Sequence, residues 1–130
     1  MPGRAADWVG MFAHDLHLLL TVATLVAMVV VAVEAAVRLA RGRPPGRFAA
    51  RSLAVVLILV VTAAAGGLAL LVGGHRPHEW WHAMYAGFAF AMIPLADSIA
   101  LKASVRWKAL ARLIGALVAI EVIVRLFQTG

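Results

Sequence analysis

Two long stretches without any Asp, Glu, Lys or Arg constrain this chain more than any other feature. They cover residues 16–33 and 52–74, which is 18 and 23 residues. A helix rises about 1.5 Å per residue, so about 20 apolar residues cross the roughly 30 Å hydrocarbon core of a bilayer. Both stretches therefore predict membrane-spanning helices.

The composition agrees with a membrane location. Of the 130 residues, 64% are hydrophobic and 14% are charged. A soluble domain carries about 25% charged and about 45–50% apolar residues. A small domain leaves much of its surface exposed, so this excess of apolar side chains is expected to face lipid. The length allows a single domain over residues 1–130.

Turn-forming and basic segments divide the chain into four apolar runs. Residues 41–47 are rich in Arg, Gly and Pro, residues 73–79 begin with two glycines, and residues 102–112 are again basic. Paired prolines and glycines interrupt a helix. We expect an all-α integral membrane protein, a bundle of four transmembrane helices at about residues 12–40, 52–74, 80–101 and 108–127. The fourth run is the least apolar, since Glu121 and Arg125 interrupt it.

Lysine and arginine are unevenly distributed among the connecting segments. The first and third connections carry nine of them, whereas the second connection and the amino-terminal segment carry only Arg76 and Arg4. Because the loops richer in Lys and Arg stay in the cytoplasm, both termini are predicted to be non-cytoplasmic, in a bacterial inner membrane. The net charge of +6 thus marks topology, and we expect no nucleic-acid partner.

Small residues on the second and third runs predict close helix contact. Residues 63–67 read Ala-Ala-Ala-Gly-Gly, and the third run carries Ala83, Gly87 and Ala91 at intervals of four. Small residues let helix backbones approach each other in membranes. We therefore expect the second and third helices to be closely packed neighbours.

Three acidic residues lie within or near the apolar runs, where an unpaired charge is costly. Near the cytoplasmic ends, Glu34 is expected to pair with Arg38 or Arg41, and Asp97 with Lys102. Glu121 precedes Arg125 by four residues, the favourable order for an intrahelical ion pair.

The predicted topology brings all five histidines to the outer surface of the membrane. On the first helix, His17 shares a semi-polar face with Thr21, Thr24 and Met28, with His14 one turn before it. On the third helix, His82 shares a face with Tyr85, Ala86 and Ala89. These faces are expected to point into the bundle, since polar groups in lipid need partners.

The two faces suggest a cofactor site. Two histidines on separate helices at similar depth are a typical arrangement for holding a b-type haem by both axial positions. His17 and His82 are the predicted iron ligands, His14 lies beside them, and Arg76 and Arg125 are placed to pair with haem propionates. One alternative is a copper or zinc site in an outer cluster of His14, His75, His78 and His82. The other is that the chain binds no cofactor.

A family resemblance covers roughly residues 62–94. The segment AAAGGLALLVGGHRPHEWWHAMYAG (63–87) resembles one half of haem A synthase and of similar bis-histidine four-helix membrane cytochromes. In those proteins a glycine-bearing helix leads through an outer loop to a helix with a haem-ligating histidine. The resemblance implies that His82 is an axial ligand and extends to no other histidine. The loop cysteines of the synthase have no counterpart here, since the chain has no cysteine.

The leading hypothesis is a small membrane subunit of a respiratory or photosynthetic electron-transfer complex, with haem b between the first and third helices. One rival is a cofactor-free accessory subunit that stabilises a larger membrane complex. Another is a copper- or zinc-handling membrane protein. The sequence contains no G-x-S-x-G motif and no phosphate-binding loop. Its one H-E-x-x-H match, residues 78–82 (HEWWH), begins in the polar turn expected before the third helix and not within a helix. No catalytic residue and no catalytic activity of its own are therefore expected. The expected partners are the lipid bilayer and other membrane subunits.

Overall fold

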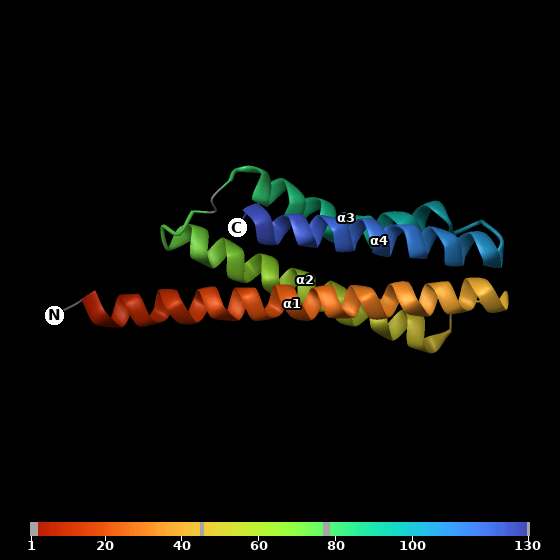
Figure 1. The fold of residues 1–130 in the computed structure, drawn as a ribbon, viewed down its shortest axis with the longest axis horizontal. Helices are drawn as coiled ribbons and strands as arrows, with labels where there is room; N and C mark the ends of the chain where they lie inside the picture. Colours follow the sequence, from red (N-terminus) through yellow and green to blue (C-terminus); the bar gives the residue numbers. More distant parts are fainter. Residues whose placement is uncertain (1–2, 45, 77–78, 130) are drawn as a thin grey trace.

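The computed structural model describes residues 3–44, 46–76 and 79–129 and contains four helices (Figure 1). They are α1 (Gly3–Arg41), α2 (Arg47–Val72), α3 (Trp81–Ile99) and α4 (Val105–Thr129). The described ranges contain no strand. The prediction of an all-α chain with four helices is therefore confirmed.

The helix ends follow local sequence signals. Gly42 adopts a left-handed conformation (φ 61°), which glycine accepts without steric cost, directly after the last residue of α1. The backbone N–H of Gly42 donates to Leu39 and that of Arg43 donates to Arg38, which is the hydrogen-bond pattern of a Schellman motif. Both helices begin earlier than expected. Helix α1 begins at Gly3 and not near residue 12, and α2 begins at Arg47 and not near residue 52.

The four helices form an antiparallel bundle that is closed on three sides. Helix α1 packs against α2 and α4, and α4 also packs against α3, whereas α2 and α3 make few contacts. Helices α1 and α3 therefore lie diagonally across the bundle. The two ends of the chain lie at the same end of the bundle, where α1 projects beyond the other helices (Figure 1).

The predicted close packing of the second helix against the third is wrong. Ala83, Gly87 and Ala91 of α3 are exposed, and a Cβ added at Gly87 would meet nothing within 4 Å. The small residues of α2 instead face α1, because an added Cβ at Gly67 would lie 3.1 Å from the His17 ring. Small residues show that a close contact exists, but they do not say which helix makes it.

The hydrophobic core lies along the axis of the bundle and draws on all four helices. Ala116 and Ala119 of α4 have no exposed surface, which lets α1 approach α4 closely. The core cluster consists of Met28, Val31, Ala32, Val56, Val60, Ala89, Ala116, Ala119 and Ile123. The buried Thr24 and Met28, with the buried Ala89 of α3, confirm that the predicted histidine-bearing faces point inward.

The outer surface of the bundle is strongly apolar. Among the described residues, 33 large hydrophobic side chains are exposed, whereas 13 hydrophobic residues are buried. Two helical segments, Gly10–Arg41 and Arg47–Val72, are long and apolar enough to cross a membrane. At about 1.5 Å per residue, the 19 residues of α3 extend about 28 Å and the 25 residues of α4 about 38 Å.

Ion pairs hold the acidic residues of the helices. Glu34 accepts a hydrogen bond from Arg38, and Glu121 accepts one from Arg125 at 3.1 Å, both as predicted. Asp97 instead pairs with Arg112 of α4, whose Nε and Nη2 lie 3.0 and 2.5 Å from the two carboxylate oxygens. Lys102 was the expected partner, but the rotation of α4 presents Arg112 to α3. This bidentate pair joins two helices.

Candidate functional site

His17 and His82 face each other across the interior of the bundle. Their ring centroids lie 6.4 Å apart and their planes are tilted by 53°. Both residues are half-buried, and they come from α1 and α3, whose backbones make no close contact in the described part of the chain. The site therefore lies inside the bundle between these diagonal helices, closer to the chain termini than the hydrophobic core.

The His17 ring is held by α2. Its Nδ1 lies 2.9 Å from the backbone carbonyl oxygen of Ala63. A carbonyl oxygen only accepts hydrogen bonds, so Nδ1 carries the hydrogen and the neutral ring leaves a lone pair on Nε2. Gly67 lies one turn further along α2, and because it has no side chain, the His17 ring can pack directly against the α2 backbone there. Ala63 and Gly67 thus fix both the tautomer and the position of His17.

The His82 ring is held in the same way by the last residue of α4. The hydroxyl of Thr129 donates to the carbonyl oxygen of Arg125 at 3.1 Å, so its oxygen accepts from Nδ1 of His82 at 3.3 Å. Thr129 is buried, and its own carbonyl accepts from the backbone N–H of Glu79, which ties the start of α3 to the end of α4. His82 is therefore also left with a lone pair on Nε2.

In the resulting arrangement both imidazole rings are oriented through Nδ1. The direct hydrogen bonds of both rings run through Nδ1, and the backbone carbonyl of Leu126 is a further acceptor beside the His82 ring. Histidines that bind metals usually donate their other ring N–H to a carbonyl or hydroxyl group, which sets the tautomer and the ring orientation. An ion bound at about 2.0–2.1 Å to one nitrogen of each ring, on opposite sides, would hold the two centroids about 6.3 Å apart. The observed centroid separation, 6.4 Å, is close to this distance.

The other predicted site residues lie away from this pair. His14 is exposed and faces Asp15, with His14 Nδ1 and Asp15 Oδ1 3.5 Å apart. Arg76 is exposed in the connection between α2 and α3. Arg125 is exposed and donates to Glu121 and to Gln128 rather than into the bundle.

The loop histidines are only partly described. The ring of His75 lies against Gly10 of α1, where an added Cβ would be 3.1 Å from Nε2, and its Nδ1 faces Gly73. His78 lies outside the described residues, so the predicted outer cluster stays a prediction. Within the described ranges, no group of three or more His, Asp or Glu side chains is placed to hold a metal ion.

Three elements of the site were missed by the sequence reasoning: the carbonyl of Ala63, the open position at Gly67 and the hydroxyl of Thr129. The adjacent glycines Gly66 and Gly67 do indicate a close helix contact, but from the sequence this contact is expected with the third helix and not with α1. Thr129 had no comparable signal, since a threonine at the end of a helix has many ordinary roles. The hydrogen-bonding partner of an interior histidine depends on which residues of the neighbouring helices face it, and the periodicity of one helix does not specify these residues.

Comparison with protein-family models, with curated proteins and with solved structures finds no match to this chain. The resemblance of residues 62–94 to haem A synthase therefore stays a prediction.

Proposed function

We propose that this chain is a four-span membrane protein that binds a b-type haem between α1 and α3, with His17 and His82 as the axial ligands. The observation that carries the proposal is the facing pair itself, with centroids 6.4 Å apart. Each ring is oriented through Nδ1 by an oxygen acceptor from a neighbouring helix, which leaves both Nε2 atoms available for iron.

The number of ligands favours haem over a single zinc or copper ion. A zinc site usually takes three or four protein ligands, and the described residues bring together two histidines without a third His, Asp or Glu. A haem needs only two ligands from the protein, because the porphyrin nitrogens occupy the other four positions. Helices α2 and α3 make few contacts with each other, so the bundle is more open on this side than on the other three. A macrocycle would enter from this side.

The membrane location rests on surface chemistry. Exposed apolar patches of this extent are rare on soluble monomers and typical of lipid-facing surfaces. The basic residues gather at the end of the bundle that holds the α1–α2 and α3–α4 connections, so we propose that this end is cytoplasmic. The histidine pair and both termini then lie toward the outer face, in a bacterial inner membrane.

A haem with two protein ligands has no open coordination position, so it suits electron transfer rather than binding of oxygen or substrate. Bound haem would supply one-electron redox chemistry. The chain's own residues orient the ligands through Ala63 and Thr129. We propose a role as a small subunit of a respiratory or photosynthetic electron-transfer complex, in which exposed Arg76 is available for a haem propionate.

Haem content tests the proposal. The chain is expressed with haem supplied, purified in detergent, and its haem is measured per polypeptide. We expect about one haem per chain for the wild type and for His14→Ala, which removes an exposed imidazole. We expect loss of haem from His17→Ala and His82→Ala. A wild type that folds without haem would refute the proposal.

A cofactor-free accessory subunit is the second candidate. The observation that favours it is the Glu121–Arg125 pair, whose side chains are 63% and 54% exposed on the outer face of α4. Glu121 lies eight residues before the end of α4, about 12 Å from it, where charged groups facing lipid are costly. A neighbouring membrane subunit would cover the pair. A colourless chain that co-purifies with other membrane proteins would support this candidate.

A further inference from the structure

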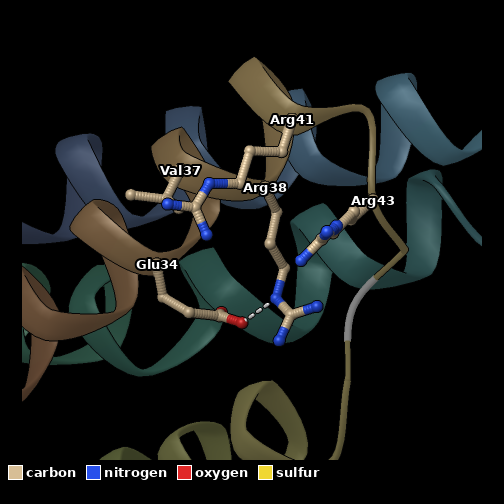
Figure 2. A pocket seen from close by; sticks show the side chains of 5 residues that line it. All are labelled: Glu34, Val37, Arg38, Arg41 and Arg43. Atoms are coloured by element: carbon tan, nitrogen blue, oxygen red, sulfur yellow. Dashed lines mark hydrogen bonds and ion pairs between the residues drawn. The ribbon is translucent and has the colours of Figure 1, made fainter.

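At the end of the bundle opposite the histidine pair, the end of α1 forms a half-open hollow of about 140 Å³. It is lined by Glu34, Val37, Arg38, Arg41 and Arg43. Figure 2 shows Arg41 and Arg43 reaching toward the Glu34–Arg38 pair from two sides. Three guanidinium groups and one carboxylate share the hollow, which leaves two positive charges without a compensating acid.

The chain holds this arrangement by its own contacts. The Schellman turn at Gly42 folds Arg43 back over the last turn of α1. Arg38 is committed to the chain, because its Nε donates to Glu34 and its Nη1 donates to the carbonyl of Pro44 at 2.5 Å. Arg41 and Arg43 make no ion pair or side-chain hydrogen bond with the described residues. They are therefore the groups available to an outside anion.

One residue that lines the hollow also carries an unpaired acceptor. The second oxygen of Glu34, Oε2, is buried and has no hydrogen-bond partner in the described part of the chain. A suitable ligand therefore combines an anion for the two arginines with a hydrogen-bond donor for this oxygen. The wall formed by Val37 is apolar. With the membrane location proposed above, this end of α1 would lie among the lipid headgroups.

We propose that this hollow binds the headgroup of phosphatidylglycerol in the leaflet that contacts the α1–α2 connection. The phosphate accepts hydrogen bonds from Arg41 and Arg43, and a glycerol hydroxyl donates to Glu34. Basic pockets between transmembrane helices on the cytoplasmic side are typical sites for anionic headgroups. The proposal rests on the membrane location proposed above and is independent of haem binding.

A second hollow of about 160 Å³ at the same end is lined by Asp97, Ala100, Leu101, Lys108 and Arg112. It repeats the combination of an acid–arginine pair with an apolar wall. However, Asp97 uses both oxygens for Arg112, so only Lys108 remains for an anion. The hollow beside α1 is therefore the stronger site.

Native mass spectrometry of the purified chain tests the proposal. The full chain in detergent is titrated with phosphatidylglycerol, with phosphatidylcholine, and with inorganic phosphate as a competitor. The test variant is Arg41→Gln with Arg43→Gln. The matched control is Arg47→Gln with Arg106→Gln, which removes two exposed arginines at the same end that line neither hollow.

We expect phosphatidylglycerol to bind the wild type more tightly than phosphatidylcholine. The test variant should weaken phosphatidylglycerol binding about 30-fold, since each basic residue near the surface contributes about a fivefold share and two are removed. The control should stay within about threefold of the wild type. Equal loss in both variants would refute the proposal, because the attraction would then be a general charge effect. Full displacement of the lipid by millimolar inorganic phosphate would also refute it, since the hollow would then be a free-anion site.

Failure of this proposal is distinguishable from failure of the proposed function. A chain that stays soluble without detergent refutes the membrane location itself. A chain that requires detergent and binds haem, but does not discriminate between the lipids, refutes only the headgroup site.

Discussion

His17 and His82 lie with their imidazole rings 6.4 Å apart on two helices whose described backbones make no close contact. The pair is held by the other two helices, since α2 supplies the carbonyl of Ala63 and α4 supplies the hydroxyl of Thr129. Each helix of the bundle thus contributes one group to the site. This shared support leads to predictions that separate ligand positioning from ordinary packing.

The hydroxyl of Thr129 should position His82. Thr129→Val keeps the shape of the side chain and removes the hydroxyl that accepts from Nδ1, which leaves the backbone carbonyl of Leu126 as the remaining partner of the ring. We expect haem affinity to fall about 10- to 100-fold, as for other lost partners of metal-binding histidines. Haem titration of the apoprotein measures this change. Thr129→Ser retains the hydroxyl and should bind haem like the wild type; equal affinity of the Val and Ser variants would contradict the assigned role.

The glycines of α2 and α3 should respond differently to the same substitution. A Cβ at Gly67 would lie 3.1 Å from Cε1 of His17, so Gly67→Ala should displace the ring and reduce haem content. At Gly66 the nearest ring atom is 3.8 Å from the added Cβ, and at Gly87 nothing lies within 4 Å. Gly66→Ala and Gly87→Ala should therefore retain haem and gain up to about 1 kcal/mol of helix stability. The measurements are haem content and the midpoint of thermal unfolding, and retention of haem by Gly67→Ala would exclude this contact.

The ion pairs should differ in their contribution to stability. Asp97 and Arg112 are 28% and 12% exposed and join α3 to α4, so Asp97→Asn should lower the free energy of unfolding by about 1–3 kcal/mol. Glu121 and Arg125 are mostly exposed within one helix, and Glu121→Gln should change it by less than about 0.5 kcal/mol. Denaturant titration in detergent, followed by circular dichroism, compares them. A larger effect at Glu121 would reverse this ranking.

Cysteine labelling tests the proposed orientation. The chain has no native cysteine, so Arg47→Cys and Arg76→Cys each introduce a single exposed thiol. An impermeant thiol reagent added to intact cells should label position 76, and position 47 should react only after the membrane is opened. The reverse pattern would invert the topology and place the histidine pair near the cytoplasm.

Parts of this structure could be predicted from the sequence because they depend on periodicity within a single helix. The four helices, the inward face of His17 with Thr24 and Met28, and the Glu34–Arg38 pair belong to this group. Relations between helices were harder to predict. Small residues on α2 and α3 suggested that these helices touch, yet Gly67 packs against His17, because periodicity does not specify the partner helix. The Asp97–Arg112 pair was missed for the same reason, since helix rotation selects Arg112 over Lys102.

The coordination state of the bound haem tests the central claim most directly. Haem with two histidine ligands should give a sharp α band on reduction with dithionite, and added carbon monoxide should leave the spectrum unchanged because both axial positions are filled. In His17→Ala and in His82→Ala, any haem that remains should lose the sharp band and bind carbon monoxide. His14→Ala should behave as the wild type. A reduced wild type that binds carbon monoxide, or a spectrum that is the same in all three variants, would contradict ligation by His17 and His82.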